Sequence, residues 1–159
     1  MPNLKAVQIA GWLKDVNDNF GALAPIGADV GLGVLRVARF EFNAGVVANR
    51  TVAAHGTGVT LPANAIVTGG FLDVNTVFTS AGSATLAISV EAAADITGAT
   101  AFYAALGPFA IKPKANTPET TNVKVGAAAK EIVVTVAVAA LTAGKLTGYL
   151  YYVEGTISA

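Results

Sequence analysis

The sequence contains no cysteine and one histidine, and charged side chains make up only 13% of its 159 residues. Without cysteine the chain can form no disulfide and no thiolate nucleophile. A zinc site needs three or four Cys, His or carboxylate ligands, which a single imidazole does not supply. The ten basic and ten acidic residues cancel, and the basic ones are scattered, whereas nucleic-acid binding needs a concentrated basic face. We therefore predict no metal, no cofactor and no nucleic-acid partner.

Long hydrophobic runs are also missing. The longest apolar stretch, from Ile132 to Ala143, has about twelve residues, whereas a helix needs roughly 20 to cross a bilayer. The N-terminal residues carry one early lysine before a short apolar run and lack a clear cleavage site, so they make a poor secretory signal. These patterns predict no membrane partner.

Hydrophobic residues nevertheless make up 53% of the chain, and many lie in runs that alternate with polar residues. Such alternation is typical of half-buried β-strands. The predicted strands are residues 34–43, 65–80, 85–91, 131–140 and 145–154. The side chains predicted to face the core are Val34, Ala38, Phe40, Phe42, Leu72, Val74, Phe78, Leu86, Ile88, Val90, Ile132, Val134, Val136, Val138, Leu146, Leu150 and Tyr152.

Glycine, proline and small residues divide these strands. We predict a short strand that ends in a glycine turn at residues 47–58 and a bulge at Gly69–Gly70. Residues 93–107 could form one helical turn, residues 112–122 are an exposed loop, and residues 141–144 turn the chain back. The final strand is apolar on both faces, so it lies either in the centre of a sheet or against a second subunit. The fold class is therefore all-β, an antiparallel β-sandwich of the jelly-roll type.

The first 33 residues differ from the rest. Apolar residues from Ile9 to Phe20, including Trp12, are spaced by three and four, which predicts a short amphipathic helix. A glycine-rich stretch at residues 21–33 follows. This N-terminal arm folds onto its own sheet, docks on another subunit or is disordered. We divide the chain into the arm, residues 1–33, and the sandwich, residues 34–159.

The sequence offers little for catalysis. His55 is best explained as a turn histidine that hydrogen-bonds the backbone. Asp73 and Glu91 are both placed on an outward face, where solvated carboxylates are the ordinary state. The oxygen-rich residues 15–19 lack the glycine and the distal glutamate of a calcium-binding loop. We predict no catalytic, cofactor-binding or metal-binding residues, and the chain is not expected to be an enzyme.

The outward side chains of the last strand are the strongest binding candidates. Tyr149, Tyr151 and Val153 share its outer face, and together with Trp12 they form the predicted interface. Tyrosine suits a subunit interface because it buries a large ring while its hydroxyl finds a partner. The same pair of tyrosines could alternatively form a platform for a sugar. A subunit interface would also account for the low charge, since large exposed apolar patches are rare on monomers.

Residues 55–91, which include GVTLPANAIV and ATLAI, resemble small structural proteins of tailed bacteriophages. Residues 131–155 resemble the closing hairpin of the same proteins, which belong to the capsid decoration (cement) or head-fibre class. This resemblance implies a β-sandwich that forms homotrimers and binds the major capsid protein on the outer surface of the virion. It also implies attachment through an N-terminal arm. A receptor-binding or carbohydrate-binding jelly roll of a tail or fibre is the alternative.

Overall fold

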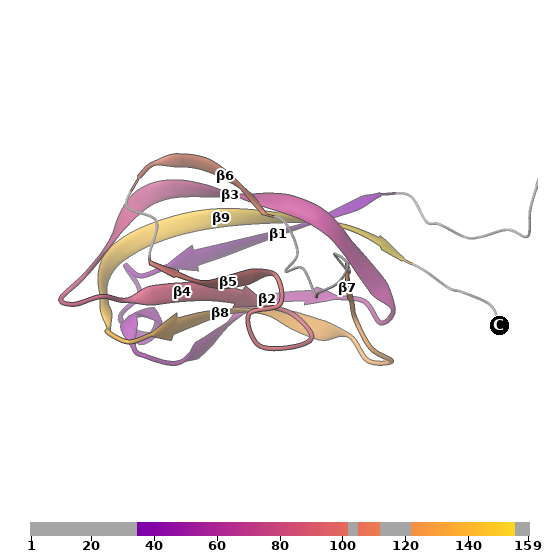
Figure 1. Ribbon diagram of the computed structural model, residues 1–159, viewed down its shortest axis with the longest axis horizontal. Coiled ribbons are helices and arrows are strands. Elements are labelled where there is room, and N and C mark those ends of the chain that lie inside the picture. Colours follow the sequence, from indigo (N-terminus) through magenta and orange to yellow (C-terminus); the bar gives the residue numbers. More distant parts are fainter. Residues whose placement is uncertain (1–34, 102–104, 112–121, 155–159) are drawn as a thin grey trace, which may run out of the picture. The chain divides into compact units, whose positions relative to one another are not determined.

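The computed structural model describes residues 35–101, 105–111 and 122–154, which form nine strands and one short 3₁₀ helix (Figure 1). All strand pairs are antiparallel, and the strands make two sheets. The elements are β1 (Arg36–Asn43), η1 (Val47–Arg50), β2 (Ala54–Leu61), β3 (Ala65–Ser80), β4 (Thr85–Ser89), β5 (Thr97–Ala101), β6 (Gly107–Ile111), β7 (Val123–Lys124), β8 (Lys130–Ala137) and β9 (Leu141–Glu154). The predicted all-β sandwich is confirmed.

The strand order is that of a jelly roll. One sheet has the order β1-β9-β3-β6, with the short β7 also paired to β3, and the other has the order β2-β8-β4-β5. Strand β1 therefore pairs with the last strand, β2 with β8, β3 with β6, and β4 with β5. This is the pattern of an antiparallel ribbon folded over on itself into two layers, the double Greek key.

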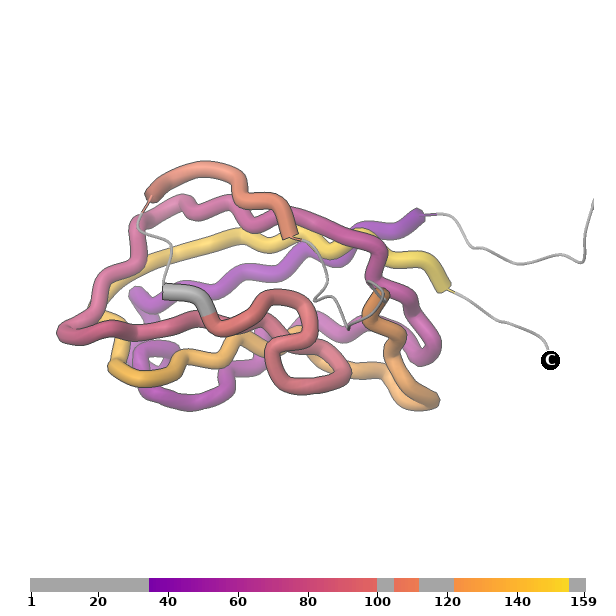
Figure 2. The backbone as a smooth tube through the Cα atoms, in the orientation of Figure 1, coloured from indigo at the N-terminus to yellow at the C-terminus, as the bar shows by residue number. Residues whose placement is uncertain are grey.

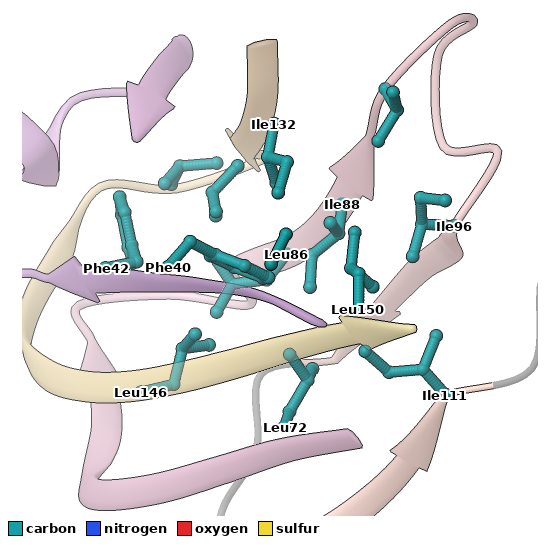
Figure 3. Close-up of a cluster of buried hydrophobic side chains, with 14 of the residues drawn as sticks. Phe40, Phe42, Leu72, Leu86, Ile88, Ile96, Ile111, Ile132, Leu146 and Leu150 are labelled. Atoms are coloured by element: carbon teal, nitrogen blue, oxygen red, sulfur yellow. The ribbon is translucent and has the colours of Figure 1, made fainter. Parts of the chain in front are cut away.

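The core lies between the two sheets and follows the predicted alternation. Phe40 and Leu150 from the first sheet face Ile88 and Ile132 from the second, and all four are fully buried (Figure 3). Of the predicted inward positions that the structure describes, all are buried except Val138, which is exposed, and Tyr152, which is half-buried and packs against the core. Because successive side chains of a strand point to opposite faces, this alternation also determines which residues point away from the core.

Strand β9 occupies a central position, between β1 and β3, as one of the two sequence-based readings predicted. Two of its inward positions are glycines. Gly148 lies directly opposite Phe40 in the register, and a Cβ at Gly148 would lie 2.1 Å from the Phe40 ring. A Cβ at Gly144 would lie 2.1 Å from the Phe78 ring. The two phenyl rings thus pack directly against the backbone of the central strand.

The connection between β1 and β2 differs from the prediction. Residues 47–50 form the 3₁₀ helix η1, because Asn49 and Arg50 donate side-chain hydrogen bonds to the carbonyls of Asn43 and Ala44, at 3.1 and 2.7 Å. Strand β2 starts later and continues through the predicted glycine turn. The amide of Gly58 there donates to the carboxylate of Glu131 at 2.6 Å, across an irregular register.

Two other turns were misplaced. Within the stretch 93–107, where a helical turn was predicted, residues 97–101 form strand β5 instead, because the Asp95 carboxylate accepts three backbone N–H bonds and reverses the chain before β5. Strand β8 ends at Ala137, so Val138 is exposed and not in the core. The predicted turn at 141–144 is already part of β9, where Leu141 is buried and paired with Ser80.

The predicted bulge at Gly69–Gly70 is confirmed, since the β3–β9 register shifts between Val67 and Gly69. The N-terminal arm with Trp12 and nearly all of the loop predicted at 112–122 lie outside the described residues, so the arm and its boundary stay predictions. No helix among the described residues has the length and apolar character needed to span a membrane.

Replacing Gly148 tests how tightly the sandwich is packed. Gly148→Ala places a methyl group in the space of the Phe40 ring, so we expect the free energy of unfolding to fall by about 1–3 kcal/mol. Urea denaturation monitored by circular dichroism measures this change. Gly98→Ala is the matched control, because a Cβ there meets nothing within 4 Å. Equal stability of the two variants would contradict the packing described here.

Candidate functional site on the outer face of the β1-β9-β3-β6 sheet

Strand β9 places the predicted interface residues on the outer face of its sheet. Because Leu146 and Leu150 point into the core, the alternating positions Tyr149, Tyr151 and Val153 point outward, and all three are half-buried. The sequence pattern therefore assigned this face correctly. The contact of these residues with another subunit stays a prediction.

The register brings further apolar side chains to the same face. Tyr149 lies between Arg39 of β1 and Phe71 of β3, and Tyr151 lies between Val37 of β1 and Gly69 of β3. Val37 is among the most exposed large hydrophobic residues that the structure describes, with 54% of its surface accessible. We call the group Val37, Phe71, Tyr149, Tyr151 and Val153 the aromatic face.

The three rings of the aromatic face contact one another. The Phe71 and Tyr149 rings are nearly parallel, with centroids 4.6 Å apart, and the Tyr151 ring meets Phe71 edge-on at 6.3 Å. Such offset and edge-on pairs are the preferred aromatic geometries. Since the rings support one another, they form a preorganised apolar surface, which loses less conformational entropy on binding than separate mobile side chains would.

A row of charged side chains lies beside the aromatic face on β1 and β9. Glu41 accepts a hydrogen bond from Arg39 and lies 3.5 Å from the Lys145 ammonium group. The hydrogen bond from Arg39, and then the charge of Lys145, lower the pKa of Glu41 below its ordinary value. A hydrogen bond with Tyr149, and then the one with Glu41, raise the pKa of Arg39. Arg39 thus links the charged row to the aromatic face.

Sequence reasoning overlooked Val37 and Phe71. Both occupy outward positions of alternating strands, and that alternation was the available signal. What the sequence did not reveal is that β1 and β3 are the two neighbours of β9, because strands far apart in sequence become neighbours only through the jelly-roll order. Trp12, the fourth predicted interface residue, lies outside the described residues.

The candidates for chemistry do not assemble into a reactive site. The His55 ring nitrogen Nε2 lies 2.8 Å from the Thr51 carbonyl, which confirms the predicted backbone hydrogen bond. Asp73 and Glu91 are not brought together, because Asp73 lies on β3 and Glu91 follows β4 in the other sheet. Within the described residues, no three His, Cys, Asp or Glu side chains are grouped as metal ligands would be.

Comparisons with known proteins find the same fold in phage capsids. A chain of the structure described as the cyanophage Pam1 capsid asymmetric unit matches at 18% identity with a TM-score of 0.54, and the match covers 96% of this chain and 99% of that chain. A chain from the capsid of Ralstonia phage GP4 matches at 19% identity with a TM-score of 0.57, covering 84% and 92%. No protein-family model and no curated protein sequence matches the chain.

The charged row predicts a pH dependence of stability. Because folding lowers the pKa of Glu41, its stabilising contribution is present above its ordinary pKa of 4.5 and disappears as the pH falls through the lowered value. The Glu41→Gln variant lacks this contribution at every pH. The melting temperature of the wild type should therefore exceed that of the variant near neutral pH, and the difference should vanish on acidification.

Differential scanning fluorimetry between about pH 7 and about pH 3 measures this difference. The same series in about 1 M salt is the control, because screening weakens exposed ion pairs and should reduce the difference at neutral pH. A difference that grows on acidification would contradict the assigned direction of the pKa.

Proposed function

We propose that this chain is a structural protein of a phage virion, and more specifically a capsid decoration protein that binds the outside of the shell as a homotrimer. The jelly-roll fold shared with chains of two phage capsid structures supports a virion role. The resemblance of residues 55–91 and 131–155 to decoration and head-fibre proteins supports the finer assignment. The proposed role requires no catalytic residue and no cofactor.

The aromatic face is the main observation that supports a homotrimer. Tyrosine and phenylalanine are enriched at protein interfaces, whose centres are depleted of charge, and the charged row of Arg39, Glu41 and Lys145 lies where a polar rim is expected. A preorganised apolar centre beside a charged edge is the arrangement that contacts between subunits use. We assign Tyr149, Tyr151 and Val153 to the contact between copies of the chain.

A trimer suits the proposed task physically. Three copies joined together present three identical contacts to the shell, so that weak individual contacts combine into strong overall binding. The major capsid protein is the proposed partner. Residues 1–33, with Trp12, are proposed to add a further contact.

Substitution of Tyr151 tests the proposed interface. The wild type should sediment with three times the mass of one chain, because the aromatic face is buried between copies. Tyr151→Asp introduces a charge into that contact and should shift the protein to monomers at micromolar concentration. Sedimentation equilibrium measures both masses, and circular dichroism verifies that the variant is folded.

Val133→Asp is the matched control for this experiment. Val133 is a half-buried, outward residue of β8 in the other sheet, so its charge variant should remain trimeric. A wild type that is monomeric at micromolar concentration, or a Tyr151→Asp variant that remains trimeric, would reject the aromatic face as the trimer contact.

A carbohydrate-binding module of a tail or fibre is the second candidate. It is favoured by one observation, the presence of polar groups beside the stacked Phe71 and Tyr149 rings, since the Arg39 guanidinium contacts Tyr149 and Asp73 follows on β3. If this function holds, the wild type should bind members of a glycan array and Tyr149→Ala should lose that binding. A wild type that binds no glycan would leave the decoration role as the better assignment.

A further inference from the structure

One end of the jelly roll is built from loops that neither the fold nor the aromatic face explains. The β1–β2, β3–β4 and β8–β9 connections reach this end, at the left of Figure 1, where β5 also ends and β6 begins. Hydrogen bonds join the loops to neighbouring strands, since Val136 donates to the Ala53 carbonyl and Ala44 to the Gly144 carbonyl. We call residues 44–53, 81–84 and 138–140 of these connections, together with residues 105–106 just before β6, the loop tip.

The loop tip is apolar although it faces solvent. Seven large hydrophobic residues are classed as exposed among the described residues, and five of them lie in the loop tip: Val46, Val47, Val52, Leu106 and Val138. The only charged side chain of the loop tip is Arg50. Exposed apolar groups that gather in one region mark interaction sites, whereas singly scattered ones need no explanation.

Val138 supplies an independent argument that the loop tip has a function. Its φ angle is 71°, a left-handed conformation that is a genuine outlier for a β-branched residue. At 73%, its side chain is also the most exposed of the large hydrophobic residues described, so burial does not compensate for the backbone strain. Strained conformations of this kind concentrate at functional sites, and here the strain directs an apolar side chain into solvent.

A hollow of about 310 Å³ lies at the same end, between the β1–β2 loop and the strands β3 and β9, and Gly45 and Arg50 of the loop tip line it. Arg50 and Lys145 contribute two cations to its lining, and Thr76 and Thr142 contribute hydroxyl groups, while no carboxylate lines it. The Lys145 ammonium group also lies 3.5 Å from Glu41 of the charged row, so Arg50 is the cation of the hollow that has, among the described residues, only backbone carbonyls as partners. Hydrogen bonds of 2.7 and 3.4 Å to the Ala44 and Gly45 carbonyls fix the Arg50 guanidinium. Positioned cations beside hydroxyl donors suit a carboxylate, which arginine binds through paired N–H bonds.

We infer that the loop tip docks on a protein segment of another subunit of the shell, a segment that presents a carboxylate beside apolar side chains. The carboxylate enters the hollow near Arg50 and Lys145, and the apolar side chains cover Val47 and Val138. A second copy docked tip to tip fits less well, because it would bring the two Arg50 cations together. The inference rests on the proposed virion role, which supplies the partner.

The loop tip lies at the end of the sandwich opposite to the start of β1 and the end of β9, as Figure 2 shows. None of the residues substituted below belongs to the N-terminal arm, so the substitutions leave the arm unchanged.

Replacing Val138 separates docking from folding. Val138→Gly relieves the strained backbone, so its melting temperature should rise by about 2–4 °C. The same variant lacks the apolar side chain, so its dissociation constant for the shell should increase about tenfold. Ala94→Gly is the matched control, because Ala94 also has a left-handed φ of 56° but lies in the β4–β5 loop at the other end. This control should gain stability without losing affinity.

Replacing Lys145 tests the carboxylate. Lys145→Gln should weaken shell binding several-fold at low salt, and the loss should diminish as salt screens the interaction. Because Lys145 also belongs to the charged row beside the proposed trimer contact, sedimentation equilibrium verifies that the variant has the oligomeric mass of the wild type. Lys124→Gln, an exposed lysine of β7 outside the hollow, should bind as the wild type does. The probe in both series is the purified phage shell prepared without this protein, and co-sedimentation over a range of protein concentrations gives the affinities.

The outcomes distinguish this inference from the role on which it rests. A wild type that does not co-sediment with the shells would reject the decoration role, and the docking inference with it. A wild type that binds while Val138→Gly binds equally well would reject only the loop tip. If Lys145→Gln and Lys124→Gln bind the shells with equal affinity, the inference that the partner presents a carboxylate is wrong. If Val138→Gly instead abolishes association larger than the trimer in the absence of shells, the occupant is a second copy and the inference is overturned.

Discussion

The packing of two phenyl rings against the glycines of β9 is the constraint on which the sandwich depends. Phe40 of β1 and Phe78 of β3 come from the two strands that flank β9, and each ring occupies the space that a side chain on Gly148 or Gly144 would fill. Because protein interiors are close-packed, the contact of the two rings with these glycines determines how β1 and β3 pack against the central strand. The outer face of the same three strands carries the aromatic face.

Because charged residues are scarce, the positions of the few that are present help to identify the surfaces that could bind a partner. Arg39, Glu41 and Lys145 form one connected row beside the aromatic face, and Arg50 is the single charge of the loop tip. Both apolar surfaces thus have polar groups at their margin, an arrangement typical of interfaces that assemble from soluble subunits. A protein whose task is to join neighbours would need such surfaces more than it needs reactive groups.

The sequence predicted strands better than connections, for a physical reason. Alternation of polar and apolar residues is a local signal, so it placed Phe40, Leu86 and Ile132 correctly in the core. Connections depend on partners that are distant in sequence. The glycine-rich β2 continues through its expected turn because Glu131 binds the Gly58 amide, and Val138 lost its expected core position because β9 begins three residues later. No local pattern contains these contacts.

By itself, the sequence determined the all-β class, the inward and outward faces of the long strands, and the absence of cysteine chemistry. Tertiary structure alone decided which strands are neighbours, and so it placed Val37 and Phe71 beside the tyrosines of β9 and brought Arg50 and Lys145 to one hollow. The reason is that side-chain direction follows from the period of a single strand, whereas pairing order depends on how the whole ribbon folds over and closes its core.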